Sequence, residues 1–347
     1  MHVLAINSGS SSLKLGLYRV QRGEVQSLWA DAAGSLAGLA RRLLDAGLPP
    51  PQAIGHRIVH GGPRLRRHCR IDDGVLAQLR AATPFAPLHG PAALAAIMAA
   101  QAQFPGLPQV ACFDTAFHAT LPEVARTLPL PHALRDQGLQ RYGFHGLSCE
   151  SIVHQLAGAL PQRLLIAHLG NGASISALQD GISIDTSMGM TPAGGIVMGT
   201  RSGDLDPGTL VWLMREKKLD ADALEDLLER RSGLAGISGI SGDMRRLHAA
   251  AATNADARLA IEMFCTSAAK QIAAMSTVLG GIDLLVFSGG IGENDETVRN
   301  AICSRLVGIG LTKRQVRVLR SQEDEQIARH TCALVAQGSE PLSPPAQ

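Results

Sequence analysis

The stretch that decides the fold is VLAINSGSSSLKLGLYRV, residues 3–20. An apolar run ends at Asn7, glycine and serines form a short turn, and alternating apolar and polar residues follow Lys14. Glycine, hydroxyl groups and a cation together are typical of a phosphate-binding backbone. A P-loop, however, needs a glycine before the lysine and a helix after it, whereas Leu13 precedes Lys14 and the alternation predicts a strand. We therefore expect strand, turn and strand, which an ordinary serine-rich hairpin would also explain.

The same pattern recurs in the middle of the chain. Residues 163–187, RLLIAHLGNGASISALQDGISIDTS, predict a strand, a Gly/Asn/Ser turn, a strand, a turn and a strand. Asn7-Ser-Gly-Ser10 corresponds to Asn171-Gly-Ala-Ser174. An internal duplication over this separation predicts two similar α/β lobes. Between them we expect a central cleft that both turns face, which is a common place for a ligand.

Composition bounds the class of protein. The chain has 347 residues, enough for two domains that each bury a core, and its 46% apolar and 18% charged residues are typical of a globular protein. A net charge of +2 and an aromatic content of 3% argue against a nucleic-acid or membrane surface. Because no signal-peptide pattern and no apolar run of about eighteen residues occurs, we expect a cytoplasmic protein.

The cysteines predict neither redox chemistry nor a zinc site. They are widely scattered, with no C-x-x-C pair and no histidine spacing suited to zinc, so we expect reduced and mostly buried thiols. They are Cys69, Cys112, Cys149, Cys265, Cys303 and Cys332.

Predicted strands and helices alternate along the rest of the chain. Residues 282–302, IDLLVFSGGIGENDETVRNAI, predict a buried strand, a glycine-rich turn and a helix with Asn294, Asp295 and Glu296 in its cap and first turn. Such glycines let a nucleotide approach the backbone, although close packing of a helix on a strand explains them equally well. We expect further strands in VLAIN, LKLGLYRV, EVQSLWA, AIGHRIVH and QVACFD, and helices at 35–47, 90–104, 220–231 and 256–281.

Two arginines lie where their charge is unexpected. Arg57 interrupts the apolar strand in GHRIVHGG, and Arg201 lies in a long Gly/Thr/Ser/Met loop at 185–208. A buried arginine must be paired, or it must face a ligand. Guanidinium groups in such settings suit a carboxylate or a phosphoryl group in transfer, and two structural salt bridges are the alternative.

Three further segments carry polar residues that suit a site. Asp114 ends the apolar strand QVACFD, at the strand edge where sites form in α/β folds. His145 lies in a glycine-flanked turn, although a structural histidine would also fit there, and SGISGDMR adds Asp243 and Arg245. Taken together, these residues predict ATP-dependent phosphoryl transfer, in which the protein mainly positions phosphates, a magnesium ion and cations around the transferred group.

The ordered set of these motifs resembles the acetate kinase family over nearly the whole chain. The resemblance implies the fold of acetate and sugar kinases, Hsp70 and actin (ribonuclease H-like), and a homodimer. It also implies a first lobe of residues 1–115 joined by a C-terminal helix at about 322–337, a nucleotide-binding lobe of 116–321, and a disordered tail at 338–347. The motifs are INSGSSSLK, GHRIVHGG, FDTAFH, RYGFHG, HLGNGAS, MGTRSGDLDPG, SGISGDMR and GGIGEN.

Carried over position by position, the resemblance implies a role for each matching residue. Asn7 and Glu323 would hold Mg²⁺ (Mn²⁺ as an alternative), Asp114 would be the acidic catalytic residue, and His145 and Arg201 would stabilise the transition state. The carboxylate would bind at Arg57, with Leu88, His89, Phe144 and Pro192 nearby. ATP or ADP would contact Ser10, Ser12, Lys14, His168, Leu169, Gly170, Asn171, Gly172, Asp243, Met244, Arg245, Gly290, Ile291, Gly292, Glu293 and Asn294.

The resemblance implies reversible transfer of the γ-phosphoryl group of ATP to acetate by direct in-line transfer. Propionate is the nearest alternative acceptor, because one methylene in a pocket is worth only about 1–3 kcal/mol. A sugar kinase of the same fold has no need of Arg57, and a non-catalytic nucleotide-binding switch would leave both arginines unexplained. The chain departs from the family in a shorter segment between Lys14 and Arg57 and in Ala193-Gly194 where Leu-Glu is usual.

Overall fold

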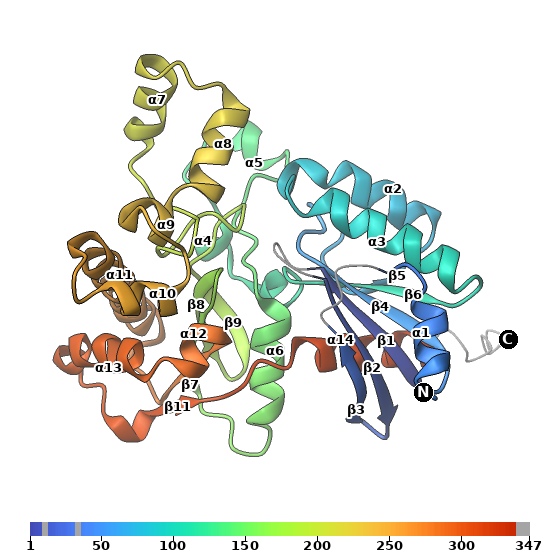
Figure 1. Ribbon diagram of the computed structural model, residues 1–347. Coiled ribbons are helices and arrows are strands. Elements are labelled where there is room, and N and C mark those ends of the chain that lie inside the picture. The colour runs from blue at the N-terminus through green and yellow to red at the C-terminus, as the bar shows by residue number, and fades with distance from the viewer. Residues whose placement is uncertain (9–12, 32–35, 338–347) are drawn as a thin grey trace, which may run out of the picture. The chain divides into compact units, whose positions relative to one another are not determined.

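A computed structural model describes residues 1–8, 13–31 and 36–337 (Figure 1). Ser10, Ser12 and the expected disordered tail lie outside the described residues. The chain forms two compact units. Unit 1 consists of Met1–Ala119, Gly146–Ser151 and Gln322–Gln347, and unit 2 of Thr120–His145 and Ile152–Ser321. None of the helices in the described part of the chain is both long and apolar enough to cross a membrane.

Unit 1 is built on a six-stranded sheet with the strand order β3-β2-β1-β4-β6-β5. Neighbouring strands β1, β2 and β3 are antiparallel, β4 and β6 continue parallel to β1, and β5 closes the sheet antiparallel to β6. The strands are β1 (His2–Ser8), β2 (Leu13–Gln21), β3 (Glu24–Asp31), β4 (Ala53–Ile58), β5 (Cys69–Arg70) and β6 (Gln109–Phe113).

Unit 2 repeats this arrangement in a five-stranded sheet with the order β11-β10-β7-β8-β9. Here β7, β8 and β9 form the antiparallel meander, and β10 and β11 continue parallel to β7. The two sheets therefore share one topology, as the internal duplication predicts. The strands are β7 (Arg163–Leu169), β8 (Ala173–Gln179), β9 (Ile182–Thr186), β10 (Leu284–Ser288) and β11 (Val316–Val318).

Helices cover both faces of the unit 1 sheet. Alternate residues of β1 point to opposite faces, so Val3 and Ala5 pack against α14, whereas Leu4 and Ile6 pack against α1 and α3. Figure 1 shows α2 and α3 side by side along the sheet, and the two helices contact each other. The helices of unit 1 are α1 (Leu39–Asp45), α2 (Asp73–Ala81), η1 (Thr83–Phe85), α3 (Gly90–Gln103) and α14 (Glu323–Gln337), and the turn η2 spans Phe117–Thr120.

The long helix α11 (Ala255–Leu279) lies against β7, β8 and β9 of the unit 2 sheet and also contacts α9, α10 and α13. Its buried side chains, which include Ala260, Phe264 and Ile272, form a continuous apolar face. The other helices that begin in unit 2 are α4 (Glu123–Arg126), α5 (His132–Arg135), α7 (Pro207–Glu216), α8 (Ala221–Arg230), α9 (Gly233–Ser238), α10 (Met244–Ala250), α12 (Gly289–Asn294), α13 (Glu296–Arg305), η3 (Val307–Ile309) and η4 (Lys313–Gln315). Helix α6 (Gly146–Gln155) belongs to unit 1 in its first part and to unit 2 thereafter.

Most predicted elements are present with small shifts at their ends. The helix expected at 35–47 begins only at Leu39, because Gly38 adopts a left-handed conformation before it. The strand expected at 53–60 ends at Ile58. The glycine-rich turn after β10 is itself a helix, α12, and Asp295 caps the next helix as expected.

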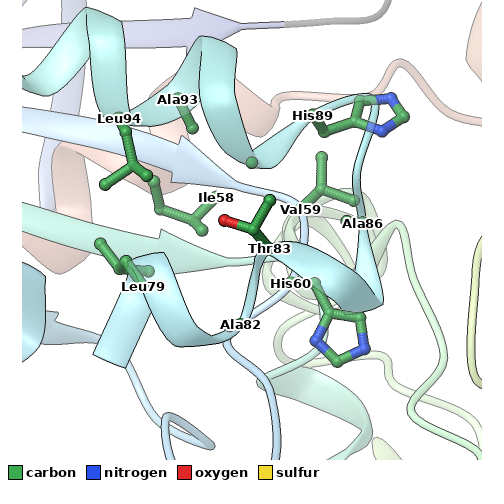
Figure 2. A pocket seen from close by; sticks show the side chains of 11 residues that line it. Ile58, Val59, His60, Leu79, Ala82, Thr83, Ala86, His89, Ala93 and Leu94 are labelled. Atoms are coloured by element: carbon green, nitrogen blue, oxygen red, sulfur yellow. The ribbon is translucent and has the colours of Figure 1, made fainter. Parts of the chain in front are cut away.

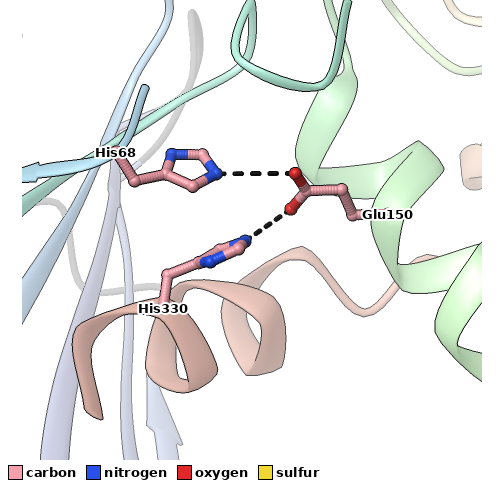
Figure 3. Close-up of side chains that lie close together, drawn as sticks. All are labelled: His68, Glu150 and His330. Atoms are coloured by element: carbon pink, nitrogen blue, oxygen red, sulfur yellow. Dashed lines mark hydrogen bonds and ion pairs between the residues drawn. The ribbon is translucent and has the colours of Figure 1, made fainter. Parts of the chain in front are cut away.

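Three parts of the chain meet at one group of side chains in unit 1 (Figure 3). Glu150 on α6 lies 2.5 Å from Nε2 of His330 on α14 and 3.5 Å from Nε2 of His68, which precedes β5. The two imidazole rings lie 3.9 Å apart between centroids. The group joins the segments that begin at Met1, Gly146 and Gln322, which are far apart in the sequence.

The described cysteines are all free thiols, as the sequence predicts. Cys112, Cys149 and Cys265 are buried, and Cys69, Cys303 and Cys332 are half-buried. Burial raises the pKa of the Cys112 thiol, so this cysteine stays protonated and unreactive.

Candidate active site

The end of β1 brings together two residues that the sequence singled out. Asn7 and Lys14 are cross-strand partners in the β1–β2 hairpin, so their side chains lie on the same face of the sheet. Asn7 is buried, and Lys14 is exposed within β2. Lys14 is the second residue of strand β2 and no helix begins there, which confirms that this stretch is not a P-loop.

Arg57 and Asp114 form a buried ion pair at the ends of the parallel strands β4 and β6. The guanidinium grips the carboxylate in a fork, with Nε 3.0 Å from Oδ1 and Nη2 2.7 Å from Oδ2. Nη1 donates to Asn7 Oδ1 at 3.1 Å. Nη1 also lies 3.9 Å from Glu323 Oε2, so a second carboxylate is at ion-pair distance from this guanidinium.

The charges of this pair depend on each other. Burial opposes ionisation of Arg57, but Asp114 and Glu323 raise the pKa of its guanidinium above the ordinary value, so Arg57 is a permanent cation. Burial raises the pKa of the Asp114 carboxyl, and the guanidinium works against that rise. A charge-assisted fork of this kind fixes both side chains in one orientation.

Helix α14 brings two carboxylates to Asn7, of which the sequence predicted one. Asn7 Nδ2 donates to Glu323 Oε2 at 3.3 Å and, more closely, to Asp324 Oδ1 at 2.7 Å. Burial and then the neighbouring Glu323 charge raise the pKa of Asp324, while Asn7, Lys14 and Arg57 lower it. Sequence reasoning missed Asp324, and the signal for it was the acidic run Glu323-Asp324-Glu325 at the start of a helix.

These residues fit a magnesium ion. Mg²⁺ prefers oxygen ligands and is commonly held by one or two carboxylates together with substrate phosphates. Glu323 and Asp324 supply such oxygens, and Asn7 contacts both carboxylates through Nδ2 while its Oδ1 accepts from Arg57. The half-buried carboxylates of Glu323 and Asp324 also repel each other, and a divalent cation would relieve that repulsion.

In unit 2, His145 is held in an uncommon backbone conformation. It has a φ of 58° and precedes α6 as the N-cap residue. Its Nδ1 lies 2.9 Å from Ser174 Oγ at the start of β8, and its ring packs on that of His168, with centroids 4.4 Å apart. Two residues predicted from separate motifs therefore lie next to each other.

Arg201 lies close to His145. A Cβ placed on Gly172 would lie 3.1 Å from His145 Nε2 and 3.2 Å from Arg201 Nη1, so both side chains approach this glycine. Arg201 Nη1 also donates to the carbonyl oxygen of Pro192, at 3.3 Å. No helix or strand occurs from Ser187 to Asp206, which confirms the long loop that carries Arg201.

Two predicted nucleotide segments of unit 2 meet at the ends of β7 and β10. A Cβ on Gly289, whose φ is 77°, would lie 2.7 Å from the carbonyl oxygen of Leu169, so a glycine is needed there. Gly290 N would lie 3.8 Å from a Cβ on Gly170. The turn after β7 and the start of α12 therefore form one glycine-lined surface.

Several predicted nucleotide contacts have structural roles. Glu293 Oε1 accepts from Gly289 N at 3.0 Å and from Ser321 N at 2.9 Å. This carboxylate therefore stabilises the backbone of α12 and the segment before α14. Leu169 and Met244 are buried core residues. Asp243 caps α10 and pairs with Arg245, whose side chain is 90% exposed.

A small cavity lies beside the end of β4 (Figure 2). It has a volume of about 10 Å³, room for about one water molecule. Of the predicted substrate residues His89 lines it, whereas Leu88 does not, and Phe144 is fully buried in unit 2. Val59 and His60 line it as well; they directly follow β4, and His60 was singled out only as a neighbour of Arg57. The other lining residues are Ile58, Leu79, Ala82, Thr83, Ala86, Gly90, Ala93 and Leu94.

Two buried hydroxyl groups have no hydrogen-bond partner among the described residues. Thr115 follows Asp114, and Ser288 precedes the glycines of α12. A buried polar group without a partner costs free energy, and such groups are common at functional sites. Sequence reasoning did not select either residue.

The group formed by His68, Glu150 and His330 has a donor set that metals accept, but its proton positions argue against a metal. His68 Nδ1 accepts a hydrogen bond from Phe113 N at 3.0 Å, which leaves the proton of the neutral ring on Nε2. That protonated nitrogen lies 3.5 Å from Glu150 Oε1 and has no lone pair to offer a metal. A metal-ligating histidine normally donates from its second nitrogen instead.

The comparisons with known proteins agree with this geometry. A family model described as the Acetokinase family matches residues 48–336. The chain belongs to the acetokinase family. Among the relatives in this family, an acetate kinase from Methylocella silvestris is 39% identical, and the match covers 96% of this chain and 98% of that protein.

Solved structures of family members share the fold. A propionate kinase from Francisella tularensis has a TM-score of 0.89 at 35% identity, and an acetate kinase from Porphyromonas gingivalis has a TM-score of 0.83 at 32% identity. Each match covers 96% of this chain and 99% of the other. The predicted fold class, a duplicated α/β fold of the acetate and sugar kinase type, is confirmed.

Proposed function

We propose that the protein transfers the γ-phosphoryl group of ATP reversibly to acetate, giving acetyl phosphate and ADP. A carboxylate oxygen of acetate bonds to the γ-phosphorus as the bond to the bridging β,γ-oxygen breaks, and ADP leaves with those electrons. Such transfer needs positioned reactants and cations around the equatorial oxygens more than covalent help from the protein. Membership of the acetokinase family supports this reaction.

The observation that carries the proposal is the meeting of His145 and Arg201 at Gly172. Arg201 supplies a permanent positive charge, and His145 supplies a ring nitrogen whose partner nitrogen is held by Ser174. Without a side chain on residue 172, both groups have access to the same small space. We propose that they stabilise the charge that spreads over the phosphoryl oxygens in the transition state.

Unit 1 contributes the groups for the carboxylate and for magnesium. We propose that Arg57 binds acetate through its guanidinium group, while Asp114 keeps that group oriented. Asn7, Glu323 and Asp324 would hold Mg²⁺, with Lys14 near the phosphates. When bound, the metal ion neutralises phosphate charge.

Acetate is favoured over longer acids by size. We propose that the cavity beside His89 and Val59, which directly follows the strand that carries Arg57, takes the methyl group of acetate. The likeness to a propionate kinase keeps propionate as the second candidate. One methylene changes such selectivity by only about 1–3 kcal/mol, so both acids have to be compared.

The test is a hydroxylamine trap for acyl phosphate with MgATP and each acid from formate to butyrate. We expect acyl hydroxamate with acetate, and the ratio of kcat/KM values for acetate and propionate identifies the preferred acceptor. Folded protein that binds ATP but forms no acyl phosphate with any acid would contradict the proposal. A non-catalytic nucleotide-binding switch would then be the better description.

We also propose that the enzyme is a cytoplasmic homodimer. Helix α7 exposes Val211, Trp212 and Met214, and none of its residues is buried in the described chain. An exposed apolar surface of this kind supports contact with a second copy. Sedimentation of the wild type and of Trp212→Glu tests this: we expect a dimer and a weakened dimer, respectively, and a monomeric wild type contradicts it.

A further inference from the structure

Two segments predicted to bind the nucleotide lie at the starts of two helices in unit 2. Asp243, Met244 and Arg245 begin α10, and Gly290–Asn294 directly precede α13. Both helices pack on α11. More than forty residues separate the two segments along the chain, so their spacing depends on contacts between the helices.

One hydrogen-bonded pair joins these segments directly. His248 Nε2 lies 2.8 Å from Asp295 Oδ2. His248 is one turn after Met244 on α10, and Asp295 follows Asn294. The two side chains are 33% and 17% exposed, so the pair is partly shielded from water.

Both oxygens of the Asp295 carboxylate are used. Oδ1 accepts from Val298 N at 3.0 Å and thereby caps α13, while Oδ2 binds His248. Helix α13 also binds the α12 segment, because Arg299 Nη1 donates to the carbonyl oxygens of Gly292 and Glu293, at 3.0 Å each. Those bonds tie α12 to α13, whereas the histidine ties it to α10.

We propose that His248 is a positioning residue for the nucleotide: through Asp295 it fixes the spacing of the α10 and α12 segments before ATP binds. A site ordered in advance loses less conformational entropy on binding, so its affinity is higher. This inference rests on the proposed function, because it assumes that the two segments contact ATP or ADP. The effect should appear in nucleotide affinity, since His248 itself contacts neither substrate in this proposal.

Two substitutions break the pair from opposite sides. His248→Ala removes the donor, and Asp295→Ser keeps a good N-cap residue for α13 but is too short to reach the histidine. His248→Gln retains a side-chain N–H and is the rescue variant. The matched control is His132→Ala, which removes the exposed His132–Asp136 pair on α5 of the same unit, with its Nδ1–Oδ2 distance of 3.0 Å.

Binding of the fluorescent nucleotide mant-ADP with Mg²⁺ is measured first, because it needs no catalysis. We expect His248→Ala and Asp295→Ser each to raise Kd about three- to tenfold, in line with the loss of one partly exposed hydrogen bond. The double variant should be no weaker than either single variant, since both remove the same contact. His248→Gln should restore part of the affinity, and His132→Ala should bind as the wild type does.

Kinetics then separate positioning from general damage. We expect KM for MgATP to rise by about the same factor, with kcat and KM for acetate within about twofold of the wild type. Unchanged mant-ADP affinity in both single variants, additive effects in the double variant, or an equal loss in His132→Ala would overturn the inference. If the wild type itself fails to bind mant-ADP, the proposed function fails instead.

Discussion

Arg201 is a buried cation that lies beside the carbonyl group of Pro192 and beside Gly172. Its Nη1 donates to the carbonyl oxygen of Pro192, and the missing side chain of Gly172 leaves it next to His145. The guanidinium carries its positive charge at every pH at which the protein is folded, so it can bind an anion that arrives with the substrate.

For Arg201→Ala we therefore expect kcat to fall about 10²- to 10³-fold and KM to change much less, because the contact forms mainly in the transition state. The measurement is steady-state formation of acetyl phosphate. Arg231→Ala is the control, since Arg231 pairs with Asp226 and its side chain is 57% exposed. A near wild-type kcat for Arg201→Ala would remove this residue from the mechanism.

His56 makes the stability of the protein depend on pH. It is buried in β4, with Nε2 2.6 Å from Gln109 Oε1, and burial lowers its pKa from 6.5 to about 4. Because the folded state resists protonation, the unfolded state binds more protons as the pH falls below 6.5. Stability is then lost between pH 6.5 and about 4.

We expect the free energy of unfolding in urea to drop by about 2 kcal/mol between pH 7 and pH 5 on account of His56. In His56→Gln, which has no titrating ring, this part of the drop should disappear. The quantity to compare is the difference between the two pH values in each protein. An identical pH dependence in wild type and variant would show that His56 does not titrate as its burial requires.

Among single residues, the sequence revealed those whose charge or polarity does not match the segment around them. Arg57 and Arg201 were selected because a charge in an apolar strand or a glycine-rich loop needs a reason, and His145 because glycines flank it. Asp324 was missed, since its nearness to Asn7 depends on a helix more than three hundred residues away. Spacing along the chain cannot reveal such a contact.

Among the elements, α14 packs unusually closely on the sheet of unit 1. A Cβ added to Gly55 in β4 would overlap Thr331 Oγ1 and lie 2.5 Å from Ile327 Cγ2. This glycine is what lets the helix backbone approach the strand. The helix carries Glu323 and Asp324 at its first turn, so its distance from the sheet also places the carboxylates beside Asn7.

We expect Gly55→Ala to destabilise the protein by about 1–3 kcal/mol, because α14 must shift to make room. Urea unfolding measures the loss, and a raised Mg²⁺ requirement for activity reports the displaced carboxylates. Gly308→Ala is the control, because a Cβ there meets no atom within 4 Å. Equal stability of Gly55→Ala and wild type would mean that the helix adjusts without cost.

Strands were predicted more reliably than helix ends. The alternation in LKLGLYRV and the apolar run in QVACFD mark β2 and β6, because a strand of a half-buried or buried sheet has such a pattern. The helix α12 was not predicted, since Gly-Gly-Ile-Gly has low helix propensity. There, contacts of Glu293 and Arg299 override the local preference.

At the scale of the whole molecule, unit 1 is assembled from three separate parts of the chain. One residue from each part contributes to the group of His68, Glu150 and His330. Burial alone would raise the pKa of Glu150, but its contacts with His330 and His68 outweigh burial and hold this pKa at about 2. The ionised carboxylate therefore binds the three parts together.

Glu150→Gln should lower the free energy of unfolding by about 2–3 kcal/mol at pH 7, since a carboxyl whose pKa falls from 4.5 to about 2 on folding stabilises the folded state. The difference from the wild type should shrink as the pH falls from about 4.5 towards 2, where Glu150 becomes protonated. Asp45→Asn, at an exposed pair with Arg41, is the control. A variant as stable as the wild type would show that the group carries no net stabilisation.

The duplication could be predicted from two short turns, because a repeated strand–turn–strand pattern needs no long-range information. The sheet orders β3-β2-β1-β4-β6 and β9-β8-β7-β10-β11 then follow the same rule in both units. That Gly146–Ser151 belongs to unit 1 could not be predicted from the sequence, since nothing in those residues distinguishes them from the rest of α6. The match to the Methylocella silvestris relative extends over 398 positions, more than the 347 residues of this chain, so that relative contains segments absent here.

The order of these parts also matters while the ribosome is still synthesising the chain. Val3 and Ala5 of the first strand are covered by Ile327 and Ala328, which are synthesised more than three hundred residues later. Unit 2, by contrast, ends at Ser321, so all of its residues are synthesised before Ile327 and Ala328. During synthesis, one apolar face of the unit 1 sheet therefore stays uncovered until α14 is made. Of the two units, the one that begins first in the sequence is completed second.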